Sequence, residues 1–187
     1  MIVINRIWFE YTRSDFPNQN YGVIKLKTKK KIRGIAAGAI IAASYVVLTY
    51  IAAAFNLSSG AIQIRLSEAL TILPIFTPYA IPGLFIGCLC ANLLTGCAIT
   101  DIVFGSIATL IGAIGTYLLR KRGFLSTIPP ILSNAIIVPF ILIYVYNLEG
   151  AYPYFFFTVL AGEVISCGFL GLLLKKGLKK RIIEKYI

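Results

Sequence analysis

Residues 61–94 read AIQIRLSEALTILPIFTPYAIPGLFIGCLCANLL, and this stretch decides how the chain can fold. It lies between long apolar segments, yet it carries Gln63, Arg65, Glu68 and Asn92. Ionisable side chains are costly at bilayer depth, so they usually face the interior of a helix bundle or a cavity. If the segment after Leu66 is helical, Arg65 and Glu68 share a face and can form an ion pair or hold one polar ligand. A structural ion pair whose charges reach the headgroups is the alternative.

The composition is that of an integral membrane protein. Hydrophobic residues make up 58% of the 187 residues, charged residues make up 13%, and the mean hydropathy is +0.85. A soluble domain of this length could not cover so much apolar surface, whereas lipid solvates it. The length leaves room for one domain with about six membrane-spanning helices of roughly 20 residues each. We therefore predict an all-α integral membrane protein, a bundle of about six transmembrane helices.

The net charge of +11 is distributed as membrane topology requires, which argues against nucleic acid as the partner. Of the 18 Lys and Arg residues, all but Arg65 lie in three clusters. The clusters hold eight residues between positions 6 and 33, three at 120–122 and six between 175 and 185. Because positive clusters mark the cytoplasmic ends of spans, we predict that both termini are cytoplasmic.

Hydrophobicity and turn residues divide the chain into three regions. Residues 1–31 form a polar and basic cytoplasmic extension, residues 32–174 the six-helix membrane domain, and residues 175–187 a basic cytoplasmic tail. The predicted spans are 32–55, 66–76, 81–94, 101–119, 129–146 and 154–174. The second and third are short and bounded by prolines, which predicts tilted or partly unwound helices covered by protein or lining a cavity. Residues 1–24 fit an interfacial arm, a poorly ordered extension, or a segment before a later translation start.

Small residues recur at steps of four in the first predicted span. They are Gly34, Gly38 and Ala42, with Ala39 and Ala43 beside them. In membranes such stripes let helices approach closely. The stripe therefore fits either packing within the bundle or docking of an external partner.

Three polar residues stand out in the later spans. Asp101 opens the fourth span, where helix capping explains an acidic residue as well as ligand binding does. Asn134 lies in the first turns of the fifth span. Glu163 lies about nine residues into the sixth span, roughly 13 Å by helical rise and close to the bilayer centre. A carboxylate there needs a partner, so Glu163 is the strongest functional signal in the chain.

Several chemistries are excluded by the residues that the chain lacks. The sequence has no histidine, which removes His-ligated metal sites, Ser-His-Asp triads and His proton relays. The four cysteines form no C-x-x-C pair and are interpreted as small packing residues. No Walker A motif is present. We therefore predict no metal, no cofactor and no ATP site in this chain.

Five segments together resemble one known family. They are AIIAASYVVLTY (39–50), the stretch 60–94, DIVFGSIATLIGAIGTYLLRKR (101–122), PPILSNAIIVPF (129–140) and AGEVISCG (161–168). Their combination resembles the QueT family of queuosine-precursor transporters, which are substrate-binding (S) components of energy-coupling factor (ECF) importers. The resemblance covers about residues 34–174 and leaves the segment before Lys25 without a counterpart.

The resemblance implies a multi-pass protein of the bacterial cell membrane that captures a 7-deazaguanine such as preQ1 from outside. It implies partnership with a transmembrane coupling subunit and two ATPase subunits. It implies no catalytic group, since the protein only binds and passes on its ligand.

The polar residues suit such a ligand. A deazaguanine edge presents adjacent N–H donors to a carboxylate, amides suit its mixed edge, and an aminomethyl cation suits a second carboxylate. Stacking could come from Tyr45, Phe85 or Tyr144. The predicted substrate-binding residues are Gln63, Arg65, Glu68, Asn92, Asp101, Asn134 and Glu163. The predicted partner-docking residues are Gly34, Gly38, Ala39, Ala42 and Ala43.

Three other functions stay open. The first is an S component for another small vitamin or nucleobase. The second is a membrane-embedded enzyme that uses Glu163 and Asp101 as acid and base, although the missing His and metal motifs argue against it. The third is a structural scaffold without a ligand site.

The charge clusters generate a topology prediction. Residues 56–60 and 147–153 should lie outside, and residues 120–122 inside. In a chain without its native cysteines, single cysteines at Ser58 or Gly150 should react with an impermeant maleimide added from outside. Protection of both positions would reverse the orientation.

Overall fold

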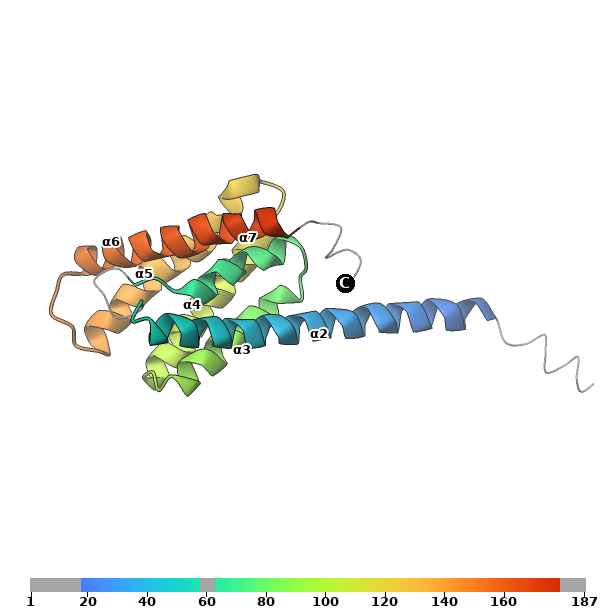
Figure 1. Cartoon of the computed structure of the whole chain (residues 1–187), viewed down its shortest axis with the longest axis horizontal. Helices are drawn as coiled ribbons and strands as arrows, with labels where there is room; N and C mark the ends of the chain where they lie inside the picture. The colour runs from blue at the N-terminus through green and yellow to red at the C-terminus, as the bar shows by residue number, and fades with distance from the viewer. Residues whose placement is uncertain (1–17, 58–62, 179–187) are drawn as a thin grey trace, which may run out of the picture. The chain divides into compact units, whose positions relative to one another are not determined.

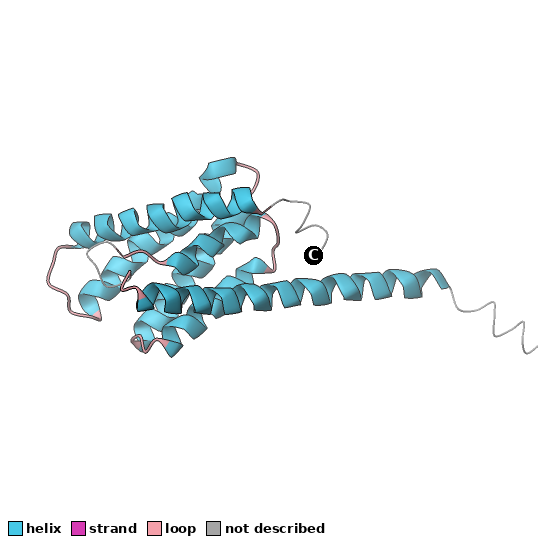
Figure 2. Ribbon diagram, in the orientation of Figure 1, coloured by secondary structure: helices cyan, strands magenta, loops and turns pink. Residues whose placement is uncertain are grey.

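The computed structural model describes residues 18–57 and 63–178, and for residues 18–27 it describes the backbone alone. Every regular element in this part of the chain is a helix (Figure 2). The prediction of an all-α protein is therefore confirmed. The amino-terminal arm, Ser58 and most of the basic tail lie outside the described residues. The chain divides into two compact units, Met1–Arg33 and Gly34–Ile187, and the candidate site lies in the second.

Helix α2 runs from Asn18 to Ala54, beginning in the first unit and continuing in the second. We expected residues 25–33 to form a basic collar before the first span, and the backbone of this run is already helical. Lys, Arg and Leu are good helix formers, and no proline interrupts the run. The sequence signal at Ile32 therefore marks where the helix becomes apolar, not where it begins.

The remaining elements follow in chain order, as the colours of Figure 1 trace. They are η1 (Leu66–Ile75), α3 (Ala80–Leu94), α4 (Ile99–Leu118), η2 (Gly123–Thr127), α5 (Ile128–Tyr144), α6 (Tyr152–Glu163), η3 (Val164–Leu170) and α7 (Gly171–Gly177). The first predicted span lies within α2 apart from its last residue, the next four each overlap one helix, and the sixth overlaps the unbroken run of α6, η3 and α7.

Four helical stretches among the described residues are long and apolar enough to cross a membrane. They are Thr28–Ala54, Ile99–Leu118, Gly123–Tyr144 and Tyr152–Gly177, whereas η1 and α3 are apolar but shorter. Large apolar side chains such as Ile111, Leu132 and Phe157 are exposed on these stretches, as expected for surfaces that face lipid. The chain is therefore a membrane protein, and the number of six crossings stays a prediction.

Helix η1 is short and largely buried, so the side chain of Glu68 lies in the interior of the second unit. It is a 3₁₀-helix with Pro74 inside it, in agreement with the short, irregular segment predicted there. Proline lacks a backbone N–H and clashes with a preceding α-helical turn. The helix packs against α4, α7 and η3. Protein therefore covers its irregular backbone, as a lipid environment requires.

The small-residue stripe of α2 packs within the chain. A Cβ atom added to Gly83 of α3 would lie 2.5 Å from the carbonyl oxygen of Gly38, so the two backbones are in direct contact. A Cβ atom on Gly87 would lie 3.0 Å from the Cα atom of Ala42. These contacts use the close approach that small residues allow between helices.

The two faces of this stripe differ in exposure. Gly34 and Gly38 are buried, and a Cβ atom on Gly34 would overlap the ring of Tyr79. Ala39 and Ala43 are exposed. Of the predicted docking residues, Ala39 and Ala43 are therefore the ones exposed for a partner, because the chain itself covers the two glycines.

The last helical run changes its winding directly after Glu163. Helix α6 ends there, η3 is a π-helix, and α7 resumes the α-helix at Gly171. Short π-helical insertions are rare and occur frequently at functional sites. The change of winding therefore draws attention to Glu163 and to the residues that follow it.

Candidate functional site

The second unit contains a cavity of approximately 560 Å³. Four predicted substrate-binding residues line it, namely Gln63, Arg65, Asn92 and Asp101. Its other walls come from α2, η1 and the residues around the ends of α3 and α5. Ligand cavities for small molecules typically measure about 300–1,000 Å³. The space therefore suits a small polar molecule.

Asp101 offers this cavity a free acceptor. It lies in the first turn of α4 and is 7% exposed. Its Oδ2 atom accepts a 3.0 Å hydrogen bond from the hydroxyl of Tyr146, whereas Oδ1 has no partner among the described residues. Burial raises the pKa of Tyr146 to about 12, so its hydroxyl keeps a proton to donate at neutral pH. Asp101 also lies in the first turn of α4, where a negative charge is favourable at the positive end of the helix dipole, so both explanations of Asp101 stay open.

Arg65 is the one basic residue among the described residues that line the cavity. Its backbone N–H donates to the hydroxyl of Ser166 at 3.1 Å, which ties the segment before η1 to η3. Burial opposes the charge of Arg65, but the carboxylates of Asp101 and Glu163 raise its pKa above the usual value. The guanidinium therefore stays ionised and can donate hydrogen bonds to a ligand.

Glu68 lies at a deeper level and is fully buried. Its Oε1 atom accepts hydrogen bonds from the hydroxyls of Tyr45 and Thr109, the latter at 3.1 Å. Its Oε2 atom has no partner in the described part of the chain. The carboxylate therefore keeps one acceptor position unused.

Of the two options for Arg65 and Glu68, the direct ion pair is not formed among the described residues. Both oxygens of Glu68 are accounted for, and neither contacts a guanidinium. Arg65 precedes η1 with an extended backbone, φ −97° and ψ 93°, so the two residues do not share a helical face.

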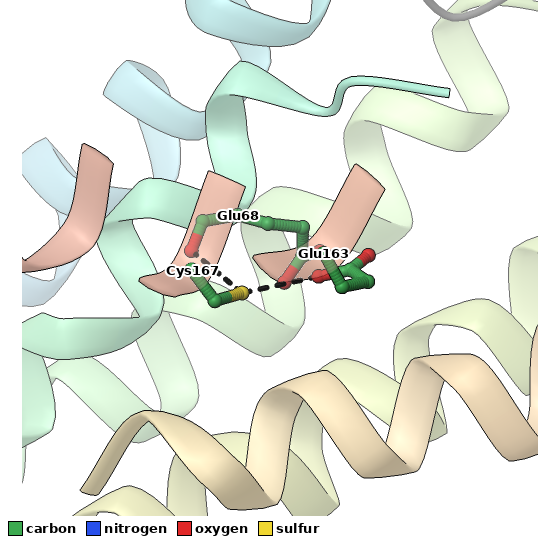
Figure 3. Close-up of side chains that lie close together, drawn as sticks. All are labelled: Glu68, Glu163 and Cys167. Carbon is green, nitrogen blue, oxygen red and sulfur yellow. Dashed lines mark hydrogen bonds between the residues drawn. The ribbon is translucent and has the colours of Figure 1, made fainter. Parts of the chain in front are cut away.

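Glu163 and Cys167 join Glu68 at this inner level (Figure 3). The Cys167 thiol donates to Oε2 of Glu163 at 3.1 Å and to the backbone carbonyl of Glu68 at 3.4 Å. One carboxylate oxygen of each Glu and the Sγ atom of Cys167 all lie within 4.8 Å of one another, and all three residues are buried. We call this group the inner acidic cluster.

Asn134 adds an unused amide to the inner acidic cluster. It is fully buried on α5 and its side chain lies beside Glu163. Neither its Nδ2 nor its Oδ1 atom has a geometrically acceptable partner among the described residues. A buried amide without partners costs about 1–3 kcal/mol, which is unusual in a protein that has no use for it.

Carboxylates and a thiol are also groups that can ligate a metal ion, although the sequence led us to predict none. Two carboxylates beside an unused amide suit an organic ammonium group equally well, because that group carries three N–H donors. Both readings require a cation at the inner acidic cluster.

Two residues connect the inner acidic cluster to the cavity. Tyr45 lines the cavity and donates its hydroxyl hydrogen to Glu68. Gly162 brings the segment at Gln63 against α6, since a Cβ atom there would lie 2.0 Å from the Gln63 carbonyl oxygen. The cavity and the inner acidic cluster are therefore neighbouring levels of one polar region.

The structure thus groups the predicted site residues in two levels and adds others. Thr109, Tyr146 and Cys167 were not predicted. A signal for Thr109 was present, because Asp101, Gly105 and Thr109 recur at steps of four and so share one buried face of α4. Cys167 lies one helical turn after Glu163 in the same way. Of the three aromatic residues considered for stacking, Tyr45 lines the cavity, whereas Tyr144 is 74% exposed.

Comparison with known proteins gives one family and one relative. The family described as QueT transporter matches residues 35–180. A curated relative, Queuosine precursor transporter QueT of Lactococcus lactis subsp. cremoris (strain MG1363), is 36% identical over 83 residues. That match covers 44% of this chain and 48% of the relative, so it spans about half of the relative's length. No solved structure matches significantly.

The unpartnered amide generates a stability prediction. Asn134→Leu should raise the unfolding midpoint of the ligand-free protein in detergent, because it removes a buried polar group worth about 1–3 kcal/mol and keeps a similar volume. Thr116→Val is the control, since the Thr116 hydroxyl donates to the Ser126 carbonyl at 2.9 Å and its loss should lower the midpoint. A lower midpoint for Asn134→Leu would show that the amide is hydrogen-bonded in the empty site.

Proposed function

Because this chain belongs to the QueT transporter family, we propose that it is the substrate-binding membrane component of an ECF-type importer. In this role it captures a queuosine precursor, a 7-deazaguanine such as preQ1, from outside the bacterial cell for ATP-driven uptake. The family is one of transporters, so the chain is a transporter and not an enzyme.

The cavity beside the inner acidic cluster is the observation that carries this proposal. Its described polar lining combines one guanidinium, one free carboxylate oxygen and amide side chains. A deazaguanine edge carries one carbonyl acceptor next to N–H donors. Arg65 and Asn92 can donate to the carbonyl, and Oδ1 of Asp101 can accept from an N–H group. Tyr45 supplies an aromatic ring on the wall.

The unpartnered polar atoms also distinguish the proposal from its rivals. A structural scaffold has no reason to keep unpartnered polar atoms on Glu68, Asp101 and Asn134. An acid–base pair of Glu163 and Asp101 would require both groups at one reacting centre. Instead, Asp101 lines the cavity beside Tyr146, and Glu163 belongs to the inner acidic cluster.

ATP-driven uptake requires partners in this proposal. The chain has no Walker A motif, so hydrolysis belongs to two ATPase subunits, and a transmembrane coupling subunit joins them to this chain. The exposed residues Ala39 and Ala43 support docking on α2, because small residues let a partner helix approach closely.

Binding and co-purification test the proposal. Purified protein titrated with preQ1 by calorimetry should bind it, and protein co-expressed with a coupling subunit and its ATPases should co-purify with them. Mass spectrometry should identify a 7-deazaguanine as the molecule carried through purification. A different vitamin or nucleobase in that fraction would replace the proposed substrate but keep the transport role. No bound molecule and no partner would contradict both.

The exposed alanines generate a docking prediction. Ala43→Trp should abolish co-purification with the coupling subunit, because a bulky ring separates the helix surfaces, while preQ1 affinity should stay within about twofold. Ile111→Trp is the matched control, because Ile111 is also an exposed apolar residue, on α4. Equal loss of partner binding in both variants, or normal assembly of Ala43→Trp, would remove this face from consideration.

A further inference from the structure

We propose that the inner acidic cluster is the binding site for the ammonium group of the ligand, so that the protein selects an aminomethyl-bearing 7-deazaguanine over its uncharged analogues. This inference rests on the proposed function and assigns a task to one part of that site. The ring occupies the cavity, and its cationic substituent points to Glu68 and Glu163.

The two carboxylates are placed for a shared cation. Glu68 and Glu163 are 0% and 3% exposed and come from different elements, η1 and the end of α6. Burying two carboxylates side by side is unfavourable unless a positive charge or a shared proton compensates them. In the described part of the chain the hydrogen-bond partners of these carboxylates are hydroxyl and thiol groups, and no Lys or Arg pairs with either.

The spacing of the acceptors fits one nitrogen atom. A charge-assisted N–H···O hydrogen bond measures about 2.8 Å between nitrogen and oxygen. One nitrogen can therefore reach two oxygens that are up to about 5.6 Å apart, and the cluster atoms lie within 4.8 Å of one another. The spacing of these oxygens is therefore one that a single ammonium group can bridge.

The unused acceptors match the unused donors of such a ligand. Oε2 of Glu68 and Oδ1 of Asn134 have no described partner, and Asn134 is 0% exposed. A primary ammonium has three N–H donors and no acceptor. Two carboxylates, and the amide of Asn134 beside Glu163, supply acceptors for such a group. An uncharged substituent such as a nitrile has no N–H donor and would leave all of them unsatisfied.

Neither Arg65 nor Lys175 forms an ion pair with the two glutamates in the described part of the chain. Arg65 lines the cavity and interacts electrostatically with Asp101 as well as with the two glutamates. Lys175 of α7 donates to the backbone carbonyl of Gly123 at 3.3 Å. When all three carboxylates are ionised, one guanidinium leaves the polar region with an excess of negative charge, which a cationic ligand neutralises.

The path from the cavity to the cluster passes Tyr45. Its side chain lines the cavity, and its hydroxyl donates a hydrogen bond to Oε1 of Glu68. The Oε2 atom of Glu68 is therefore left as an acceptor for the ligand. In the proposed pose the ring stacks on Tyr45 and its substituent points to the inner acidic cluster. This arrangement orients the ligand with its amine inward and its guanine-like edge toward Arg65 and Asp101.

Titration of two proteins with two ligands tests the inference. Wild type and Glu163→Gln are each titrated with 7-aminomethyl-7-deazaguanine and with 7-cyano-7-deazaguanine, which share the ring and differ in the substituent charge. Wild type should prefer the amine at least tenfold. The variant should lose about ten- to a hundred-fold in affinity for the amine, the value of a charge-assisted hydrogen bond, and stay within about threefold for the nitrile.

A matched control separates the cluster from general charge effects. Glu149→Gln removes an exposed carboxylate in the loop between α5 and α6 and should leave both affinities unchanged. If Glu163→Gln does not fold, titration of the wild-type protein alone still tests the selectivity for the amine. For this test 7-methyl-7-deazaguanine serves as a third ligand, which is uncharged and of similar size. The amine should bind at least tenfold more tightly than either uncharged ligand.

The remaining outcomes overturn the inference in distinguishable ways. Equal losses for amine and nitrile in Glu163→Gln would place the ring edge, not the amine, at the inner acidic cluster. Equal wild-type affinities for all three ligands would leave the proposed function intact and remove the ammonium site. Stabilisation of the wild type by Zn²⁺ alone, without selectivity for the amine, would assign the cluster to a metal ion. Absence of binding by all three ligands would refute the proposed function itself.

Discussion

The burial of carboxylates in an apolar protein is the constraint on which the rest of this structure depends. Glu68, Asp101 and Glu163 are all buried, and Arg65 is the one cation that their common region holds among the described residues. Such groups are expensive in lipid and are kept where they have a use. Hydrogen bonds from hydroxyl groups lower the free-energy cost of burying these carboxylates. Tyr45 and Thr109 both donate to Glu68, and Tyr146 donates to Asp101. It leaves the remaining acceptors unsatisfied, which is the expected state of a binding site before its ligand arrives.

Irregular helices are how the fold brings these groups together. Helix η1 is a short 3₁₀-helix that ends just after Pro74, and Glu68 is buried on it. The π-helix after Glu163 gives Ser166 and Cys167 contacts with the segment around Arg65 and Glu68. Glycine backbones complete the arrangement, because Gly162 leaves room for the Gln63 carbonyl and Gly83 for that of Gly38. In lipid, where apolar burial does not drive helices together, such close backbone contact is a main source of cohesion.

Helix α2 carries both proposed binding surfaces. Tyr45 faces inward to the cavity and to Glu68, while Ala39 and Ala43 face outward. A partner on the outer face and a ligand on the inner face would therefore act on one rigid element. Coupling between partner binding and ligand binding requires two conformations of α2 that differ in their affinity for the partner and for the ligand. Binding to the same helix does not by itself establish such coupling. The geometry identifies α2 as the element in which to look for such a change.

The sequence by itself determined the class of the protein, the approximate limits of its helices and most of the polar set. Apolar length, proline positions and basic clusters are local properties, and a membrane makes them decisive because every backbone group must be satisfied within its own segment. The residues of AGEVISCG and RLSEALT also pointed to Glu163 and Glu68 without any structure.

Only the tertiary structure decided which polar groups meet. It separated Arg65 from Glu68, because the backbone before η1 is extended. It brought Tyr45, Thr109 and Cys167 to the glutamates from three other helices. It also buried Gly34 and Gly38 against α3 and left Ala39 and Ala43 exposed. Apart from the extended backbone before η1, these outcomes depend on how segments distant in sequence pack against one another, and residue spacing within one helix shows which residues share a face but not what that face meets.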